Sequence, residues 1–276
     1  MGVLPDYLLV KKVSNQEDFF TSDHYINEYQ TCLVVESNCE EISNNDNVLV
    51  GNKIFFDPAT EIGKDLFFIY VEEVYGIISG DSIVPMNDFV YIKANKARKS
   101  EVSEGRYFSD TTYNPHDKDN IVQDGVVFSV CKKAKDSYFS NDLNVEVSAG
   151  DKVYTHHFLT DEDNERFLNG EMYYEIKYEN LYCKISDSDI VMLNDWNFVT
   201  PIEKEKEISE SGIELDLKQS NKLRVGVINY SCASLEARNI NKGDTIFFKE
   251  GREYEIDIEG SVYYRIGTND IIYKIK

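Results

Sequence analysis

Residues 242–248 read Lys-Gly-Asp-Thr-Ile-Phe-Phe, and this stretch carries the pattern that recurs through the sequence. Its Gly-Asp pair is typical of a tight turn, because glycine reaches positive φ without strain and Asp tolerates turn geometry. The β-branched and aromatic residues that follow favour a half-buried strand. The stretch therefore predicts a turn that leads directly into a core strand.

The pattern occurs twice more, in Val50-Gly51-Asn52-Lys53-Ile54-Phe55-Phe56 and in Ala149-Gly150-Asp151-Lys152-Val153-Tyr154. An apolar strand pattern precedes each stretch, at residues 31–36, 125–130 and 223–228. A tyrosine-bearing block follows each one, at residues 74–84, 181–191 and 262–272. Residues 83–92 also match residues 190–199, as if each led from one copy into the next. Ordered blocks that recur in this way indicate an internal threefold repeat.

The repeat predicts an all-β protein of three tandem small barrels with long connecting loops. We expect the barrels to cover residues 1–88, 89–195 and 196–276, the second of them with insertions. Each copy holds about five short strands, which is the usual size of a small sheet or barrel. No long stripe of apolar residues with a 3.6-residue period is present, so helix should be scarce.

The ordered blocks resemble the GroES-type co-chaperonin family, whose members carry a Gly-Asp turn before an apolar strand and a closing Ser-Asp-Ile-Leu-like element. The third copy is the most similar, through residues 242–248 and Asn269-Asp270-Ile271-Ile272. The resemblance covers most of the chain as a fold and implies three GroES-like barrels. It also implies a non-enzymatic, oligomeric protein that caps or binds a chaperonin ring.

The third copy also carries Glu210-Ser211-Gly212-Ile213-Glu214-Leu215, which is similar to the apolar tip of the family's mobile loop. The resemblance implies that Gly212, Ile213, Glu214 and Leu215 bind the partner, with Ile213 and Leu215 in a groove of the chaperonin. A flexible loop with two apolar side chains gives weak contacts that a ring multiplies by avidity. The alternative is an ordinary edge strand, because Ile213, Leu215 and Leu217 alternate with polar residues. The other two copies show no such tip in residues 14–29 and 103–124.

The composition narrows the partners and the compartment. The formal net charge of −21 opposes binding to nucleic acid, whose phosphates are also negative. Five cysteines without a Cys-x-x-Cys pair argue against a disulfide framework or a zinc site and fit a reducing compartment. Neither a signal peptide nor an apolar run long enough for a bilayer is seen. We expect a cytoplasmic protein, or alternatively a virion component, with no membrane partner.

No arrangement of residues indicates catalysis, a cofactor or a metal ion. Ser129 and Lys132 match a Ser-x-x-Lys pattern, but they lie in a predicted strand, where residues three apart face opposite sides. His156 and His157 are neighbours on a predicted strand and should point to opposite faces. The acidic run 161–165 lacks the central glycine of a calcium loop. The sequence therefore predicts no enzyme.

The sequence is compatible with three functions. The first is a co-chaperonin-like protein, which the resemblance favours. The second is a structural ring or connector protein of a bacteriophage neck or tail, which would reuse the same barrel for assembly. A hydrolase with a carboxylate site is the third and the least supported. The first two both predict a homo-oligomer, or a subunit of a large assembly.

Overall fold

The computed structural model describes residues 3–4, 6–13, 29–51, 54–55, 60–80, 82–94, 102–103, 106–107, 122–137, 141–157, 164–168, 171–202 and 223–275. The described part of the chain is mostly strand and contains one α-helix, α1 (Ala233–Glu236). The prediction of an all-β protein with little helix is therefore confirmed. The chain divides into two compact units, Met1–Asn180 and Leu181–Lys276.

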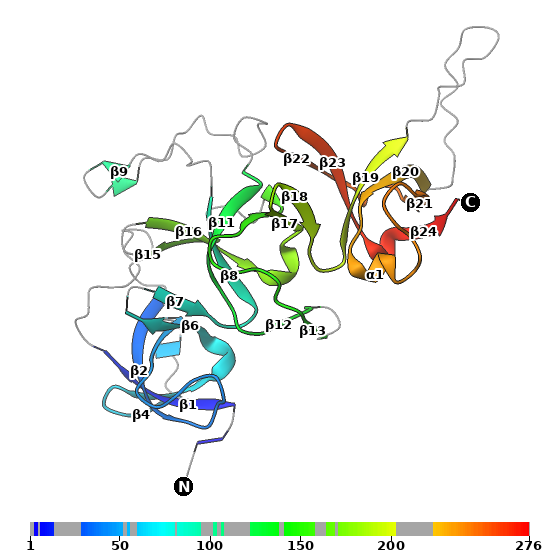
Figure 1. The fold of residues 1–276 in the computed structure, drawn as a ribbon. Helices are drawn as coiled ribbons and strands as arrows, with labels where there is room; N and C mark the ends of the chain where they lie inside the picture. The colour runs from blue at the N-terminus through cyan, green and yellow to red at the C-terminus, as the bar shows by residue number, and fades with distance from the viewer. Residues whose placement is uncertain are drawn as a thin grey trace, which may run out of the picture. The chain divides into compact units, whose positions relative to one another are not determined.

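The first unit holds a sheet at the N-terminal, blue end of the ribbon (Figure 1), which we call the first sheet. Its strand order is β4-β5-β1-β2-β3-β6-β7. The bounds are β1 (Tyr7–Lys12), β2 (Tyr29–Ser37), β3 (Asn47–Gly51), β4 (Glu61–Gly63), β5 (Leu66–Tyr70), β6 (Val74–Ser79) and β7 (Ser82–Pro85), with the 3₁₀ helix η2 (Val71–Glu73) before β6.

The same unit holds the second sheet, in which neighbouring strands follow the order β15-β16-β8-β11-β14. The bounds are β8 (Phe89–Ala94), β11 (Asp124–Val130), β14 (Lys152–Tyr154), β15 (Glu165–Leu168) and β16 (Glu171–Lys177), with η5 (Tyr178–Asn180) after β16. Two short hairpins accompany it, formed by β9 (Val102–Ser103) with β10 (Arg106–Tyr107) and by β12 (Ala134–Lys135) with β13 (Asp142–Leu143).

The second unit begins with the hairpin of β17 (Cys183–Ser186) and β18 (Asp189–Met192). It continues with the third sheet, whose order is β22-β23-β19-β20-β21-β24. The bounds are β19 (Trp196–Ile202), β20 (Leu223–Tyr230), β21 (Thr245–Lys249), β22 (Tyr254–Ile258), β23 (Ser261–Gly267) and β24 (Ile271–Lys274), with η6 (Thr268–Asp270) before β24.

The three sheets repeat one strand order. In each, the first strand of the repeat (β1, β8 or β19) pairs on one side with the second strand and on the other with the strand that precedes the 3₁₀ helix. Every pairing is antiparallel. The described strands form open sheets, since β4 and β7 are edges of the first one. Closure into barrels and the division into three domains stay predictions.

The predicted glycine turn before the third strand of each repeat is confirmed in the second and third copies. Gly150 and Gly243 have φ of 97° and 89°, and β14 and β21 follow. For the first copy the prediction is wrong, because Gly51 is the last residue of β3. The left-handed residue is Asn45, with a φ of 71°. Asn occupies this region more easily than most residues, so it replaces glycine here.

The turn makes the same hydrogen bonds three times. The N–H of the left-handed residue donates to the carbonyl of a residue in the second strand at 2.8 Å. The N–H of this second-strand residue donates back, at 2.8–2.9 Å, to the carbonyl of the Asp that follows the left-handed residue. The Asp side chain accepts a bond from the backbone N–H three residues before it, at 2.7–3.0 Å. The three sets are Asn45, Asp46 and Val34; Gly150, Asp151 and Val127; and Gly243, Asp244 and Ile228.

A β-bulge follows at once on the second strand of every repeat. The extra residues are Val35, Phe128 and Asn229, each of which interrupts the pairing with the first strand. A bulge bends its strand and re-aims the side chains around it. The bulges therefore curve all three sheets at the same place.

The corner that opens each repeat is also shared. The carbonyls of Asp6, Asp88 and Asp195 accept the N–H of the first 3₁₀ residue, at 3.0, 2.7 and 2.9 Å. The predicted match of residues 83–92 with 190–199 is confirmed by two further bonds of 2.9 Å. In one the Met86 N–H donates to the Tyr75 carbonyl, and in the other the Leu193 N–H donates to the Tyr182 carbonyl.

One predicted block falls on a different strand. Residues 262–272 begin in β23, which pairs with β19 in the way that β5 pairs with β1. Residues 74–84 begin in β6, which pairs with β3. The true counterpart of β6 is β24, because it pairs with β21 and follows a 3₁₀ helix. The match was made on tyrosines, which β6 and β23 both contain although they hold different places in the sheet.

The cores are mostly apolar, but the third sheet buries a polar side chain at a position where the other two sheets have apolar ones. Leu8 and Val90 are fully buried on β1 and β8, and Asn197 is equally buried at the same place on β19. The Asn197 side chain accepts the Cys232 N–H at 2.9 Å and donates to the Thr268 hydroxyl at 3.0 Å. Both of these partners are buried too. The buried amide is therefore hydrogen-bonded on both of its ends, as a polar group in a core must be.

The left-handed turn gives a first test. Gly150→Ala should lower the free energy of unfolding by about 1–2 kcal/mol, because a Cβ is strained at positive φ. The added methyl would meet nothing within 4 Å, so the loss is purely one of backbone strain. Gly63→Ala is the matched control, because a Cβ there makes only ordinary contacts from 3.7 Å outward. Urea unfolding monitored by circular dichroism measures both, and equal midpoints for the two variants would contradict the assignment.

Candidate assembly site

The residues predicted to bind a partner, Gly212, Ile213, Glu214 and Leu215, lie outside the described residues, in the segment 203–222. Their role stays a prediction. The expectation that His156 and His157 point apart is wrong, since their rings stack with centroids 4.7 Å apart. The reason is that β14 ends at Tyr154, so the alternation of a strand no longer applies to them.

Within the first unit, a buried apolar cluster joins the first sheet to the second. Leu49 and Ile83 come from β3 and β7, and Tyr91 and Tyr173 come from β8 and β16. All four are at most 8% exposed. Tyr75 of β6 and the bulged residue Phe128 of β11 pack against it. We call these six residues the junction cluster.

Tyr75 is itself the extra residue of a bulge. The register of β3 with β6 shifts so that Leu49 faces Gly76 and Val50 faces Val74, which makes Tyr75 an extra residue between them. The shift turns its ring out of the first sheet towards the second. On the other side, the Phe128 ring lies 4.3 Å from the Tyr173 ring, measured between centroids.

Ile83 is a fully buried and closely packed member of the junction cluster. A Cβ added at Gly76 would come within 2.6 Å of its side chain, so only a glycine leaves it room. The hydroxyl of Ser129 donates to the Ile83 carbonyl at 2.5 Å. Ser129 therefore has a structural partner in the contact between the sheets.

A buried polar pair lies at the edge of the junction cluster. The Tyr91 hydroxyl donates to Glu175 Oε1 at 2.9 Å, and the Glu175 carboxyl is 4% exposed. A hydrogen bond to a carboxylate in a water-poor site is stronger than one between neutral groups. The bond gives the hydroxyl of Tyr91 a partner although the residue is fully buried.

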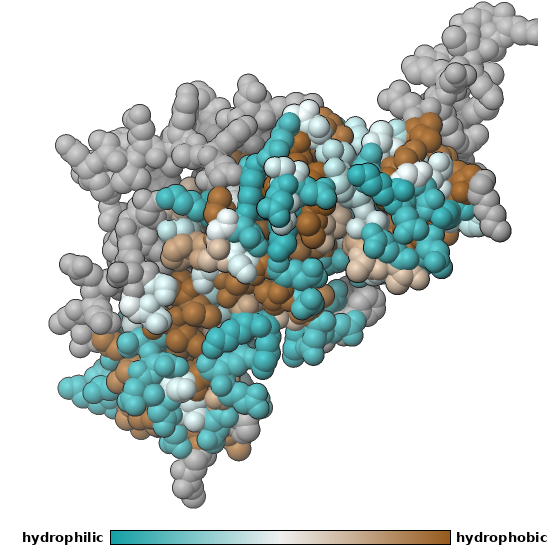
Figure 2. Space-filling view, viewed as in Figure 1, coloured by the Kyte–Doolittle hydropathy of each residue, from teal (hydrophilic) through white to brown (hydrophobic). Residues whose placement is uncertain are grey.

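A small cavity lies beside the junction, next to the apolar surface over β6 and β7 that Figure 2 shows in brown. Its volume is about 20 Å³, which is room for one water molecule rather than for a metabolite. Lys133 Nζ lies 2.8 Å from Glu41 Oε1 across its rim, and this hydrogen bond raises the pKa of Lys133. The lining residues are Glu41, Ile77, Val84, Pro85, Met86, Asn87, Cys131, Lys132 and Lys133.

A comparable contact occurs within the second unit, between the β17–β18 hairpin and the third sheet. Tyr182 occupies the position of Tyr75, because its carbonyl makes the equivalent corner bond. Its ring meets Trp196 edge-on at 5.4 Å, and the Arg265 guanidinium lies over both rings, 4.9 Å from Tyr182 and 4.3 Å from Trp196. A cation over aromatic faces is attracted by their quadrupoles. Burial raises the pKa of Tyr182, so its hydroxyl stays protonated.

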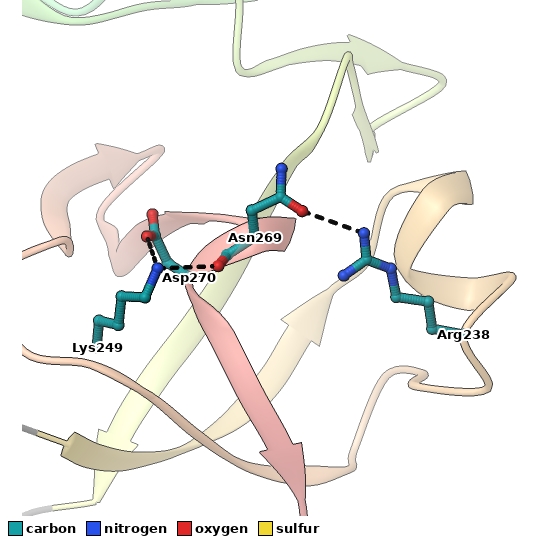
Figure 3. A network of polar contacts seen from close by, with 4 residues as sticks. All are labelled: Arg238, Lys249, Asn269 and Asp270. Carbon is teal, nitrogen blue, oxygen red and sulfur yellow. Dashed lines mark hydrogen bonds and ion pairs between the residues drawn. The ribbon is translucent and has the colours of Figure 1, made fainter.

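Two cations fix the 3₁₀ helix η6 in the third sheet, which sets the position of β24. Lys249 Nζ donates to the Asn269 carbonyl at 3.2 Å and lies 3.4 Å from Asp270 Oδ1. Arg238 Nη2 donates to Asn269 Oδ1 at 3.2 Å from the opposite side (Figure 3). β24 begins at the next residue, Ile271, so these bonds determine how its side chains are presented.

The buried thiols are poor nucleophiles. Burial raises the pKa of Cys32 and of Cys131 to about 12 in each case. None of the five cysteines forms a disulfide bond. Within the described residues, no three His, Cys, Asp or Glu side chains lie close enough together to hold a metal ion.

Neither the protein-family models nor the curated proteins include a match to this chain. In the described segments, the structure has no helix that is long and apolar enough to cross a membrane.

The junction gives a second test. Ile83→Ala should lower the free energy of unfolding by about 2–5 kcal/mol, because it leaves a cavity in a fully buried cluster. Ile62→Ala removes the same atoms from a side chain that is 51% exposed, so its effect should stay within about 0.5 kcal/mol. Chemical denaturation of both variants measures the difference. Equal stabilities would show that Ile83 does not hold the two sheets together.

The thiols give a third test. With a pKa of about 12, roughly one buried thiol in ten thousand is ionised at pH 8. Cys32 and Cys131 should therefore react with a thiol reagent only as fast as the chain unfolds, and the half-buried Cys39 should react first. Labelling followed by mapped mass spectrometry measures each site. Labelling of Cys131 as fast as Cys39 in the native protein would contradict the assignment.

The raised pKa values of Cys32 and Cys131 also make their contribution to the free energy of unfolding depend on pH. The ordinary thiol pKa is 9.0, so an unfolded chain releases these protons at lower pH than the folded one does. The contribution of the buried thiols is thus complete below about pH 9 and decreases as the pH rises above it.

Proposed function

We propose that this chain is a non-enzymatic, oligomeric protein of the co-chaperonin type, built from three GroES-like barrels. One observation supports this most directly. Successive repeats contact one another through their bulges, as Tyr75 and Phe128 do in the first unit. A barrel that packs side against side through aromatic residues is suited to extension into a ring wall.

The proposed partner contact is the segment Gly212-Ile213-Glu214-Leu215, through which the chain binds a chaperonin ring. The proposal for this segment depends on its similarity to the family's mobile loop. The acidic charge of −21 supports a protein partner rather than nucleic acid. The site of action proposed is the cytoplasm.

A second candidate is a ring or connector protein of a virion. The observation that favours it is the tight packing of the first two repeats, since Ile83 leaves room only for glycine at position 76. Tight packing gives a stiff structural element, whereas a lid needs a loop that binds and releases. The two candidates differ in their partner.

The loop gives a fourth test. Ile213→Asp should reduce chaperonin binding at least tenfold, because it puts a charge on the apolar tip that would enter the groove. Leu217→Asp is the control, since the tip model leaves that residue outside the groove. Pull-down on purified chaperonin rings measures both variants. Equal loss in both would favour the edge strand, and unchanged binding of Ile213→Asp would rule out the mobile-loop role.

A further inference from the structure

The contact between the first and second repeats is made by two different kinds of face. The trailing face surrounds the bulge before the corner, and in the first sheet it consists of Leu49, Tyr75 and Ile83. The leading face surrounds the bulge of the second strand, and in the second sheet it includes Tyr91, Phe128 and Tyr173. These two faces are the two halves of the junction cluster. The same geometry identifies a trailing face on the third sheet and a leading face on the first.

The trailing face of the third sheet is exposed. Phe247 faces Tyr273 and Phe248 faces Ile271, so Ile272 is the extra residue of a bulge, as Tyr75 is in β6. Ile272 is 52% exposed and Tyr273 is 56% exposed. Within the described residues, β24 has β21 as its single strand neighbour, whereas β6 has both β3 and β7.

The leading face of the first sheet is exposed as well. Val35 is its bulged residue, the counterpart of Phe128, and is 42% exposed. Phe68 pairs with Leu9 and is 37% exposed. Its counterpart in the third sheet is Arg265, which pairs with Phe198. Arg265 takes part in the contact with Tyr182, so its counterpart Phe68 lies where a neighbouring repeat would be expected.

These two faces hold a large share of the exposed apolar surface. Ten large hydrophobic side chains are exposed in the described residues, and four of them are Val35, Phe68, Ile272 and Tyr273. Soluble proteins rarely leave clustered apolar side chains uncovered unless they bind something. The internal junction indicates what would cover them, because it pairs a trailing face with a leading face.

We propose that the trailing face of one chain, Phe247, Ile272 and Tyr273, docks on the leading face of a second copy, Leu9, Val35 and Phe68. The contact continues the packing that already joins the first and second sheets. It is heterologous, since each copy uses two different faces, so it generates a closed ring or an open filament. This inference rests on the proposed assembly function and names the surfaces that perform it.

Charge limits the contact at low ionic strength. Each copy carries a net charge of −21, so copies repel one another over distances that salt shortens. The contact itself is apolar on both sides. Assembly should therefore increase between 20 and about 150 mM salt, as screening removes the repulsion.

Two face variants test the proposal. Phe68→Asp disables the leading face and Ile272→Asp the trailing face, and each alone should reduce the assembly to monomer at micromolar concentration in physiological salt. A mixture of the two should give a species of two chains and nothing larger, because one intact face of each kind remains. Recovery of this species also shows that both variants are folded. Val262→Asp is the matched control and should assemble as the native chain does, because Val262 is 50% exposed on β23, a strand that does not pair with β24.

Sedimentation velocity distinguishes the outcomes. Native mass in both face variants would overturn the proposed faces while leaving the assembly function standing. A mixture that remains monomeric would also overturn them, provided that each single variant is monomeric. A native chain that is itself monomeric at every salt concentration would overturn the assembly function together with the faces.

Discussion

The structure of each sheet depends on a pair of backbone hydrogen bonds between the turn before the third strand and the middle of the second. The left-handed residue donates one of them, and a residue of the second strand donates the other in return. Val34, Val127 and Ile228 are all buried, so the second strand contributes its end of each bond from within the core. The pair holds the second strand in place just before its bulge, and the bulge aims the next side chain outward.

The bulges convert this local geometry into contact between repeats. Phe128 leaves the second sheet and Tyr75 leaves the first, and both reach the same buried cluster. In the second unit Tyr182 performs the same role, and the Arg265 guanidinium lies over the rings of Tyr182 and Trp196. The aromatic residues that are abundant in the sequence thus lie partly between repeats rather than within single cores. Their large buried area makes each contact substantial without any ion pair at its centre.

The sequence predicted the repeat and its order because glycine marks a left-handed turn openly, as at Gly150 and Gly243. It misplaced the turn of the first copy because Asn45 performs the same function without a distinctive signal. It misaligned residues 262–272 because a tyrosine-bearing strand looks the same on either side of a 3₁₀ helix. The junction residues could not be found at all. Leu49 and Ile83 alternate as any core residue does, and only the strand register shows that they face another sheet.

Asn197 has a consequence for how the repeats recognise their own strands. Tandem copies with one strand order invite exchange during folding, since β1 or β8 could enter the third sheet in place of β19. Neither Leu8 nor Val90 could accept the Cys232 N–H or bind the Thr268 hydroxyl. An exchanged strand would therefore leave the buried Cys232 N–H without its acceptor, at a cost of roughly 1–3 kcal/mol. The Thr268 hydroxyl would lose one bond but keep its contacts with Cys232 Sγ and Ser234 Oγ. The buried amide of Asn197 thereby favours the incorporation of β19, rather than β1 or β8, into the third sheet.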